Sequence, residues 1–487
     1  MRIEENKLVS VHAASAADVE PQYDTKAAIP YTELLAGFCS RLEYADIPAD
    51  VVARTKLCIL DSVGTMLAGA TTELGASVYR AATGFETSAI STVFGFRTRS
   101  SPTAAALVNG TLSEIFELQD GWRFGNNHPC VVIPAALALA EWKQTSGKSL
   151  IAAVVAGYEV TNRLAWSVHP RHLARGYLPT GTAGTCGSAV AAGKLLGFDT
   201  DRMADALGVA GFILPISTAE NLWCGYSAKP LHSGYAAKLG IEAALLAEQG
   251  FSGCPVEGAP QRGMGFLEIT TGEVKFERIL DRLGEHYTVR DVYFKAFPAC
   301  RHVHGTAEAT LNIVRSESIP AEAIDRIDIY TYALSASLLN RYTDSESSMI
   351  AAQFSIPYVA AAAIVDKALG TEQFLDRRIH DPIILALARR VRLMSDAEIN
   401  ARYPEVTPTR VEITLNNGRI IRNQVDMPKG DPRSPISESE LLAKFRHLAG
   451  MAVDGGTVSE IEVAILNLDR HDDLAPVFEL LNARKAS

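Results

Sequence analysis

The sequence predicts a mainly α protein, in which a large all-α helical domain carries an inserted smaller α+β domain. Between residues 30 and 270, one Ala- and Gly-rich segment after another has apolar residues at three-and-four spacing, which is typical of helices. After about residue 290, apolar and polar residues alternate in two places, as in half-buried strands. Helical spacing returns from residue 437, which favours a C-terminus that rejoins the first domain.

Helices of the first domain are expected over seven segments. The first begins at a Pro-Ala-Asp start that suits a helix N-terminus, and small residues in the others let helix axes approach closely. The segments are 48–70, 101–118, 131–144, 149–168, 182–197, 201–213 and 233–250.

The inserted domain is expected to contain three regular elements. Residues 323–333 alternate as a strand, and 351–369 form an apolar helix. Residues 409–428 predict a hairpin of two alternating strands around Asn417-Gly418. Helices over 437–450 and 459–469 then follow.

These patterns divide the chain into three parts. Residues 1–28 are polar and carry several acids, so they lack the features of a secretory signal or a transit peptide and are expected to be a loose tail. The all-α domain is assigned to 29–285 and 432–487, and the α+β domain to 286–431.

Composition excludes several functional classes. The 487 residues have a net charge of −10 and no Lys/Arg-rich run, which argues against binding to nucleic acid or to a membrane surface. No apolar stretch is long enough for a transmembrane span. The seven Cys are scattered and form no CxxC pair, so we expect reduced thiols, a cytoplasmic location, and neither a zinc ribbon nor an iron–sulfur cluster.

Polar groups interrupt the apolar helices at four places, and the first is "GWRFGNNHP" at 121–129. His128 stands there just before Pro129 and an apolar helix. The Asn residues and Pro suit an ordinary helix entry, whereas the imidazole also suits catalysis from the rigid end of a buried helix. Glu117 and Asp120 lie shortly before His128 along the chain.

The second and third places are also helix starts. The Gly/Thr turn at 175–190 points backbone N–H groups at one spot, as in an anion site. "KPLHSG" puts Lys229 and His232 at the head of an apolar helix. Taken alone, Lys229 could be a solvated residue and His232 a satisfied buried histidine.

The fourth place is 293–310, which crowds Lys295, Cys300, Arg301, His302 and His304 together at the domain junction. The two His could lie on one face of an ordinary strand, and Cys300 could be a small buried hydrophobe. A metal pair is disfavoured, because no acidic or Cys ligand lies at a helpful spacing, so no metal site is predicted.

Other common catalytic motifs are missing from the sequence. No GxSxG elbow occurs, and "GTAGTCG" is neither a dinucleotide-binding fingerprint nor a Walker A loop. The remaining set of Arg, Lys and His suits a small, multiply charged anion, because Arg and Lys neutralise carboxylates and His transfers protons near neutral pH.

Eight segments in order give the chain a resemblance to the MmgE/PrpD family from about residue 30 onward. They are "LCILDSVGTMLAGA", "ALVNGTLSEIFELQD", "HPCVVIPAALALAE", "GYLPTGTAGTCGSAVAAGKLLG", "KPLHSGYAAKLG", "GFSGC", "KAFPACRHVHGTAEA" and "AAQFSIPYVAAA". The resemblance implies a large all-α domain, a smaller α+β lid, a homodimer, and an active site in the cleft between the domains. It also implies that the enzyme needs no metal and no organic cofactor.

The resemblance also implies roles for individual residues. His128 would transfer a proton, Asp120 would be the acid of the family's Asp-rich stretch and would orient His128, and Lys229 and Lys295 would bind carboxylates or handle protons. The neighbouring substrate-binding residues would be Tyr177, His232, Cys300, Arg301 and His304.

Three departures from the family pattern bear on the reaction. Leu178 stands where many members have a His, the stretch Glu117–Gly121 replaces an Asp-rich run, and Cys300 stands where the animal cis-aconitate decarboxylases have a His. These departures disfavour a cis-aconitate decarboxylase. We therefore predict a cofactor-independent lyase, a dehydratase of a small di- or tricarboxylate resembling 2-methylcitrate, acting by proton abstraction beside a carboxylate. The alternatives are an epimerase or decarboxylase of a related polycarboxylate, and an inactive family member that serves as a binding or structural dimer.

Overall fold

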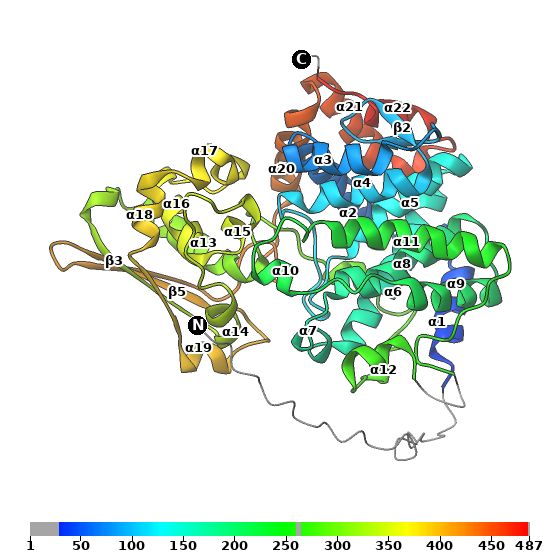
Figure 1. Ribbon diagram of the computed structural model, residues 1–487, viewed down its shortest axis with the longest axis horizontal. Coiled ribbons are helices and arrows are strands. Elements are labelled where there is room, and N and C mark those ends of the chain that lie inside the picture. The colour runs from blue at the N-terminus through cyan, green and yellow to red at the C-terminus, as the bar shows by residue number, and fades with distance from the viewer. Residues whose placement is uncertain (1–28, 260–263, 486–487) are drawn as a thin grey trace, which may run out of the picture.

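A computed structural model describes residues 29–259 and 264–485, and it has two units of unequal size. Figure 1 shows a large body of helices and a smaller unit in which helices cover one sheet. The prediction of a mainly α protein is confirmed. The expected tail, residues 1–28, lies outside the described residues.

The body contains the predicted helices, with boundaries shifted by a few residues. They are α2 (Ala49–Gly69), α4 (Pro102–Ile115), α5 (Val132–Lys143), α6 (Gly147–Val168), α8 (Pro179–Leu195), α9 (Thr200–Ile213) and α11 (Leu231–Glu248). Helices α1 (Tyr31–Arg41) and α3 (Glu73–Thr83), and the short hairpin of β1 (Ser91–Val93) with β2 (Thr98–Ser100), were not predicted.

Small residues set the spacing of the central helices. Helix α8 packs against both α6 and α11, and α11 also packs along α4. A Cβ added to Gly187 of α8 would lie 1.9 Å from Oγ1 of Thr161 on α6, so only glycine allows this approach. The Ala- and Gly-rich composition therefore reflects close helix packing, which fixes the ends of α4, α8 and α11 relative to one another.

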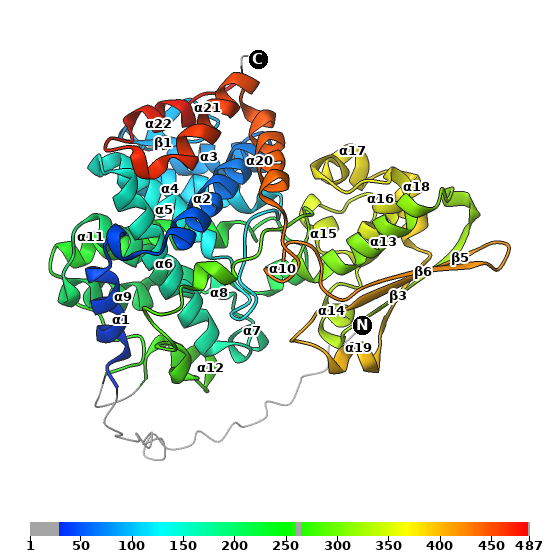
Figure 2. The same ribbon diagram turned by 180° about the vertical axis from the view of Figure 1, so that it is seen from behind.

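Three C-terminal helices lie on the body rather than on the smaller unit (Figure 2). They are α20 (Glu438–Ala452), α21 (Gly455–Leu466) and α22 (Ala475–Leu481). Helices α20 and α21 pack against α2, and side chains such as Leu441 and Phe445 belong to the core of the body.

The smaller unit is a four-stranded sheet with helices on one face (Figure 1). Its strand order is β4-β3-β5-β6, with β3 parallel to β4 and the other pairs antiparallel. The predicted strand and hairpin are present as β3 (Ile324–Thr331), β5 (Thr409–Leu415) and β6 (Ile420–Val425), while β4 (Val391–Ser395) was not predicted. Helices α13 (His304–Ser316), α16 (Ile356–Asp366) and α18 (Pro382–Ala388) enclose a second hydrophobic core with the sheet.

The structure differs from the predicted boundaries in two ways. The smaller unit was expected to begin at residue 286, but Tyr287, Val289, Val292 and Phe294 pack into the core of the body. The expected helix over 351–369 is divided into α15 (Met349–Gln353) and α16, because the Ser355 hydroxyl caps α16 by accepting from the Tyr358 N–H.

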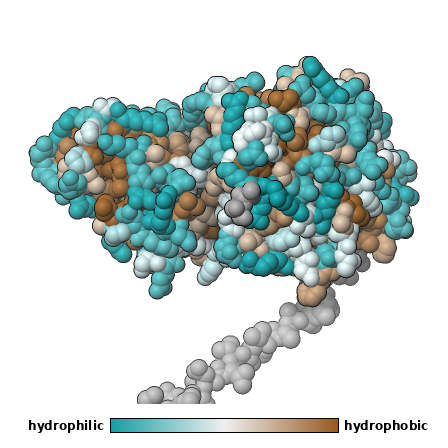
Figure 3. All heavy atoms as spheres, turned by 90° about the horizontal axis from the view of Figure 1, so that it is seen from above, coloured by the Kyte–Doolittle hydropathy of each residue, from teal (hydrophilic) through white to brown (hydrophobic). Residues whose placement is uncertain are grey.

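The surface and the thiols agree with the composition. In the part of the chain that the structure describes, no helix has both the length and the apolarity that a bilayer crossing requires. All seven cysteines are free, and most are buried. Seen from above, apolar residues are interspersed with polar ones over both units (Figure 3).

Candidate active site

A pocket lies between the body and the smaller unit, with a cavity volume of about 60 Å³. The body contributes residues from the end of the loop before α5, from the start of α8 and from α11, and the smaller unit contributes α14 (Ala333–Leu338). The pocket therefore has the position between domains that is common for small-molecule sites. Its charged and aromatic lining residues are Glu117, His128, Trp223, His232, Tyr293, Arg301, His302 and Phe354.

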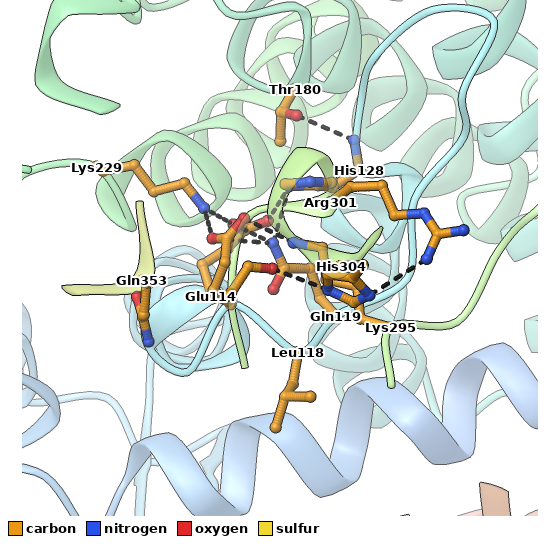
Figure 4. Close-up of polar contacts among 12 residues, drawn as sticks. Glu114, Leu118, Gln119, His128, Thr180, Lys229, Lys295, Arg301, His304 and Gln353 are labelled. Atoms are coloured by element: carbon orange, nitrogen blue, oxygen red, sulfur yellow. Dashed lines mark hydrogen bonds and ion pairs between the residues drawn. The ribbon is translucent and has the colours of Figure 1, made fainter. Parts of the chain in front are cut away.

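Two buried glutamates, Glu114 and Glu117, form the centre of an ion-pair network at this pocket. Figure 4 shows Glu114 with Lys229, Gln119 and Lys295 around it. Glu114 lies in the last turn of α4, and Glu117 follows that helix directly. The Lys229 ammonium donates to Glu114 Oε2 at 2.6 Å and also to Glu117 Oε2, while Lys295 donates to Glu117 Oε1 at 2.6 Å. All four side chains are at most 2% exposed. Residues far apart in sequence therefore converge at one point.

The backbone at Glu117 is held in a conformation that a non-glycine residue adopts rarely. Its φ is +52°, in the left-handed region, which costs about 1–3 kcal/mol. The turn directs the Glu117 carboxylate between Lys229 and Lys295, one from the start of α11 and the other from the chain before α13. The ion pairs therefore offset the strain of this backbone.

The glutamates and lysines of the network stabilise one another in their charged forms. Burial by itself raises the pKa of Glu117, but Lys229 and Lys295 outweigh it and lower that pKa to about 2. Burial likewise opposes ionisation of Glu114, and Lys229, His128 and His232 together hold the pKa of Glu114 well below its usual range. Burial alone lowers the pKa of Lys229, but Glu114 and Glu117 raise it, so the amine stays an ammonium ion.

His128 is oriented by the same network. Its backbone N–H donates to the Thr180 hydroxyl at 3.0 Å, and its Nδ1 lies 3.0 Å from Glu114 Oε1. Because Glu114 is ionised, it accepts a hydrogen bond from Nδ1–H, which leaves Nε2 unprotonated. Gln119 Nε2 donates to Glu114 Oε2 at 2.6 Å, so it helps to fix the carboxylate. Gln119 Nε2 also lies 2.9 Å from His128 Nδ1, but both groups are donors in this tautomer and no hydrogen bond joins them.

The protonation state of His128 suits a base. Burial lowers its pKa to about 4, with Glu114 acting in the opposite direction. The ring is therefore neutral at pH 7 and can accept a proton at Nε2. His128 stands at the N-cap position of a 3-10 turn that begins at Pro129, as the helix-entry interpretation expects, but its side chain contacts Glu114 instead of capping that turn.

Arg301 is the cation of the pocket that carries no carboxylate partner among residues 29–259 and 264–485. Its guanidinium donates to the backbone carbonyls of Pro428 and Lys429 at 2.8 and 2.9 Å, and it lies over the Tyr293 ring. His304 Nε2 donates to the Ala299 carbonyl, so Nδ1 accepts from Arg301 at 3.2 Å. Arg301 is thus positioned to bind an anion, and His304 supports it from beneath rather than lining the pocket.

The remaining candidates divide between the wall of the pocket and its surroundings. His232 is 6% exposed and lies 3.2 Å from Glu114 Oε2, but neither of its ring nitrogens has a hydrogen-bond partner among the described residues. Cys300 lines the pocket as a thiol, since burial raises its pKa to about 11. His302 also lines the pocket, in a 3-10 turn followed by α13, so the alternative of a strand at His302 and His304 is wrong.

Two predicted residues lie elsewhere. The prediction that Asp120 orients His128 is wrong, because Asp120 accepts from the Cys130 N–H and the Tyr158 hydroxyl, and Glu114 takes the place beside His128. Burial raises the pKa of Asp120 to about 7. Tyr177 does not line the pocket, since its ring packs on His172; its neighbours Leu178 and Thr180 line it instead.

Sequence reasoning missed Glu114 and Gln119. Both lie within "SEIFELQD", where a helix ends in three acidic residues before a Gly. Acids near a helix C-terminus are unfavourable for the helix dipole, so this placement was a signal that a buried cation pairs with them.

Glu114, His128 and His232 each offer one ligand atom, and these atoms lie within 4.8 Å of one another. Both Glu114 oxygens already accept from His128, Gln119 and Lys229, and a cation there would lie next to an ammonium group. These donors therefore fit an ion-pair network better than a metal, and independence of metals and cofactors stays a prediction.

Comparison with known proteins connects this geometry to a family. The model of the MmgE/PrpD N-terminal domain matches residues 33–279, and that of the MmgE/PrpD C-terminal domain matches 297–470. The chain is 29% identical to the cis-aconitate decarboxylase of Aspergillus terreus, over 94% of this chain and 97% of that protein. It is 29% identical to the enzyme of that name from Mus musculus, over 92% and 93%. Its identity to the mitochondrial 2-methylcitrate dehydratase of Yarrowia lipolytica is 23%, over 77% and 76%.

Proposed function

The chain belongs to the MmgE/PrpD family, and from this premise we propose that it is a lyase that dehydrates a small tricarboxylate resembling 2-methylcitrate. The observation that carries the proposal is the Glu114–His128 pair, which leaves an unprotonated imidazole nitrogen at a pocket that also holds Arg301. Dehydration beside a carboxylate needs both a base and a cation.

In the proposed reaction, Arg301 binds the carboxylate next to the carbon that loses its proton. His128 Nε2 takes that proton, and Glu114 stabilises the resulting imidazolium through Nδ1–H. The hydroxyl on the adjacent carbon leaves as water while the double bond forms. His232, whose ring nitrogens are unpartnered among the described residues, donates to the leaving oxygen.

Lys229 and Lys295 have a supporting role in this proposal. Lys229 forms ion pairs with Glu114 and Glu117, and Lys295 forms one with Glu117, so neither lysine binds substrate directly. They keep the carboxylates ionised and neutralise their charge, which prevents the two glutamates from repelling an anionic substrate. The smaller unit is proposed to act as a lid that closes on the pocket and excludes water.

Decarboxylation is the second candidate, and the comparisons favour it. The relatives named cis-aconitate decarboxylase match more of this chain, at higher identity, than the 2-methylcitrate dehydratase does. The same pocket would then bind the substrate through Arg301, and His128 in its protonated form would deliver a proton to the carbanion after loss of carbon dioxide.

Proton NMR in D₂O distinguishes these reactions, with citrate, 2-methylcitrate and cis-aconitate as separate substrates. We expect 2-methylcitrate to give an unsaturated product without loss of carbon dioxide. If the proton leaves the methyl-bearing carbon, the methyl doublet becomes the singlet of a methyl group on an alkene carbon; if it leaves the methylene carbon, an alkene proton appears. Release of carbon dioxide from cis-aconitate would replace the proposal with a decarboxylase, and deuterium exchange with inversion would replace it with an epimerase. No turnover and no binding of any of the three would contradict a lyase of this type.

A further inference from the structure

One side of the active-site pocket is apolar. Six residues, called here the apolar wall, face the polar groups: Leu173, Leu178, Leu222, Trp223, Leu334 and Leu338. They come from α7 (Arg171–Ala174), from the residue before α8, from α10 (Glu220–Trp223) and from α14, so both units contribute. The wall contains no charged side chain.

Leu178 stands at a helix start without capping the helix. It occupies the N-cap of α8, where Ser, Thr, Asp or Asn would accept from the free N–H groups, and its side chain makes no capping hydrogen bond. Its side chain packs instead with Leu173 and Ala219 in a small apolar cluster, separate from the main cores, to which Leu222 and Trp223 also belong. A leucine at this position therefore leaves the start of α8 without a side-chain cap and gives the pocket an apolar surface instead.

The wall extends beyond the active-site pocket. Leu173, Trp223, Leu334 and Leu338 also line a second pocket with a cavity volume of about 660 Å³. That pocket is bounded further out by aromatic side chains, among them Phe124, Trp166 and Tyr403. Apolar surface thus runs from beside His128 and Arg301 into an outer pocket.

Such a surface does not suit an unsubstituted tricarboxylate. Citrate and cis-aconitate carry polar groups on nearly every carbon, and placing a carboxylate against leucine side chains removes its hydration without a compensating hydrogen bond. We infer that the substrate carries an alkyl substituent longer than methyl, which lies on the apolar wall while Arg301 and His128 hold the carboxylate end. This inference rests on the proposed function and specifies its substrate class.

Isothermal titration calorimetry with citrate, 2-methylcitrate, 2-butylcitrate and 2-hexylcitrate tests the inference without requiring turnover. Burial of each methylene should tighten binding about fourfold, so the Kd of 2-butylcitrate should be about 60-fold below that of 2-methylcitrate. A Kd that stays constant or rises with chain length, while citrate and 2-methylcitrate bind, overturns this inference and leaves the proposed function standing. Failure of all four ligands to bind overturns both.

Two variants locate the chain on the wall. Leu178→Asn supplies the missing helix cap, which offsets part of the cost of placing an amide in the apolar cluster, and it adds a polar group to the wall. Leu338→Ala shortens the wall from the smaller unit. In both variants the ratio of the two Kd values should contract from about 60 to below about 10, since less apolar surface meets the chain. A ratio unchanged in both variants would place the alkyl group elsewhere and overturn the inference.

Discussion

Replacing Glu114 by Gln removes one carboxylate from the buried network with little change in shape. At present the network holds two glutamates and two lysines, so its formal charge is zero. The Gln side chain changes that charge to +1 and takes away the anion 3.0 Å from His128 Nδ1. Without it, the tautomer with a free Nε2 is no longer favoured, and the imidazolium formed during proton transfer has no counter-ion.

The expected effect is on kcat rather than on binding. General-base catalysis contributes about 10²–10⁴-fold, so kcat of Glu114→Gln should fall by about that factor. The Kd of a tricarboxylate should stay the same or decrease, because the pocket becomes more positive while Arg301 is untouched. Steady-state kinetics and calorimetry on the same preparation measure the two quantities.

A matched control separates catalysis from stability. Glu159→Gln also breaks a buried ion pair, between side chains of Glu159 and Arg163 that are 1% and 2% exposed, and Glu159 does not line the pocket. Both variants should lose about 3–5 kcal/mol of unfolding free energy in denaturant titrations. Only Glu114→Gln should lose turnover. A folded Glu114→Gln enzyme with kcat within threefold of wild type would refute the role of the Glu114–His128 pair.

Three further predictions concern residues around this network. Asp120→Asn should keep kcat/KM within about threefold of wild type and lose about 1–3 kcal/mol of unfolding free energy. The reason is that Asp120 accepts hydrogen bonds from Cys130 and Tyr158 rather than from His128. A large loss of kcat/KM in the folded variant would restore Asp120 as the partner of His128. The pKa of His128 is about 4 in the folded protein, below the unfolded value, so its contribution of about 3 kcal/mol to stability is present above pH 6.5 and lost as pH falls toward 4. Chemical denaturation should therefore show that the unfolding free energy of His128→Asn falls by about 3 kcal/mol less than that of wild type between pH 6.5 and 4. An unchanged pH dependence would contradict burial of a neutral ring. Gly187→Ala should lower the unfolding free energy by about 1–3 kcal/mol or more, because the added methyl group collides with Thr161. Gly450→Ala on α20 places its methyl group where no atom lies within 4 Å, so this variant should be as stable as wild type or more stable. Equal melting temperatures for the two variants would contradict close packing of α6 and α8.

The sequence predicted most of the helices and the hairpin, because their signals are local. Apolar spacing located α2, α6 and α11 to within a few residues, and Asn417-Gly418 marked the turn between β5 and β6. Strand β4 lacked such a signal: it is a short edge strand whose place depends on pairing with β3. The boundary at residue 286 was misplaced because burial of Tyr287 and Phe294 depends on neighbours distant in sequence.

The site was predicted in part for the same reason. His128, Lys229 and Lys295 stood out as polar residues at helix starts or at the domain junction, and the structure brings them to two shared carboxylates. The partners were misassigned because proximity along the chain favoured Asp120, whereas the turn at Glu117 moves Asp120 toward Tyr158. Glu114, which lies one helical turn before Glu117, contacts His128 in place of Asp120. The expected homodimer, cytoplasmic location and cofactor independence stay predictions.

The most direct test of the account follows the C–H bond that His128 is proposed to break. Alkene formation is measured from 2-methylcitrate, and from the same compound deuterated at the reacting carbon, with wild-type enzyme and with His128→Asn. The account predicts slower reaction of the deuterated substrate with wild type, and a loss of about 10²–10⁴-fold in His128→Asn at unchanged substrate affinity. Alkene formation by a folded His128→Asn enzyme at the wild-type rate would contradict it.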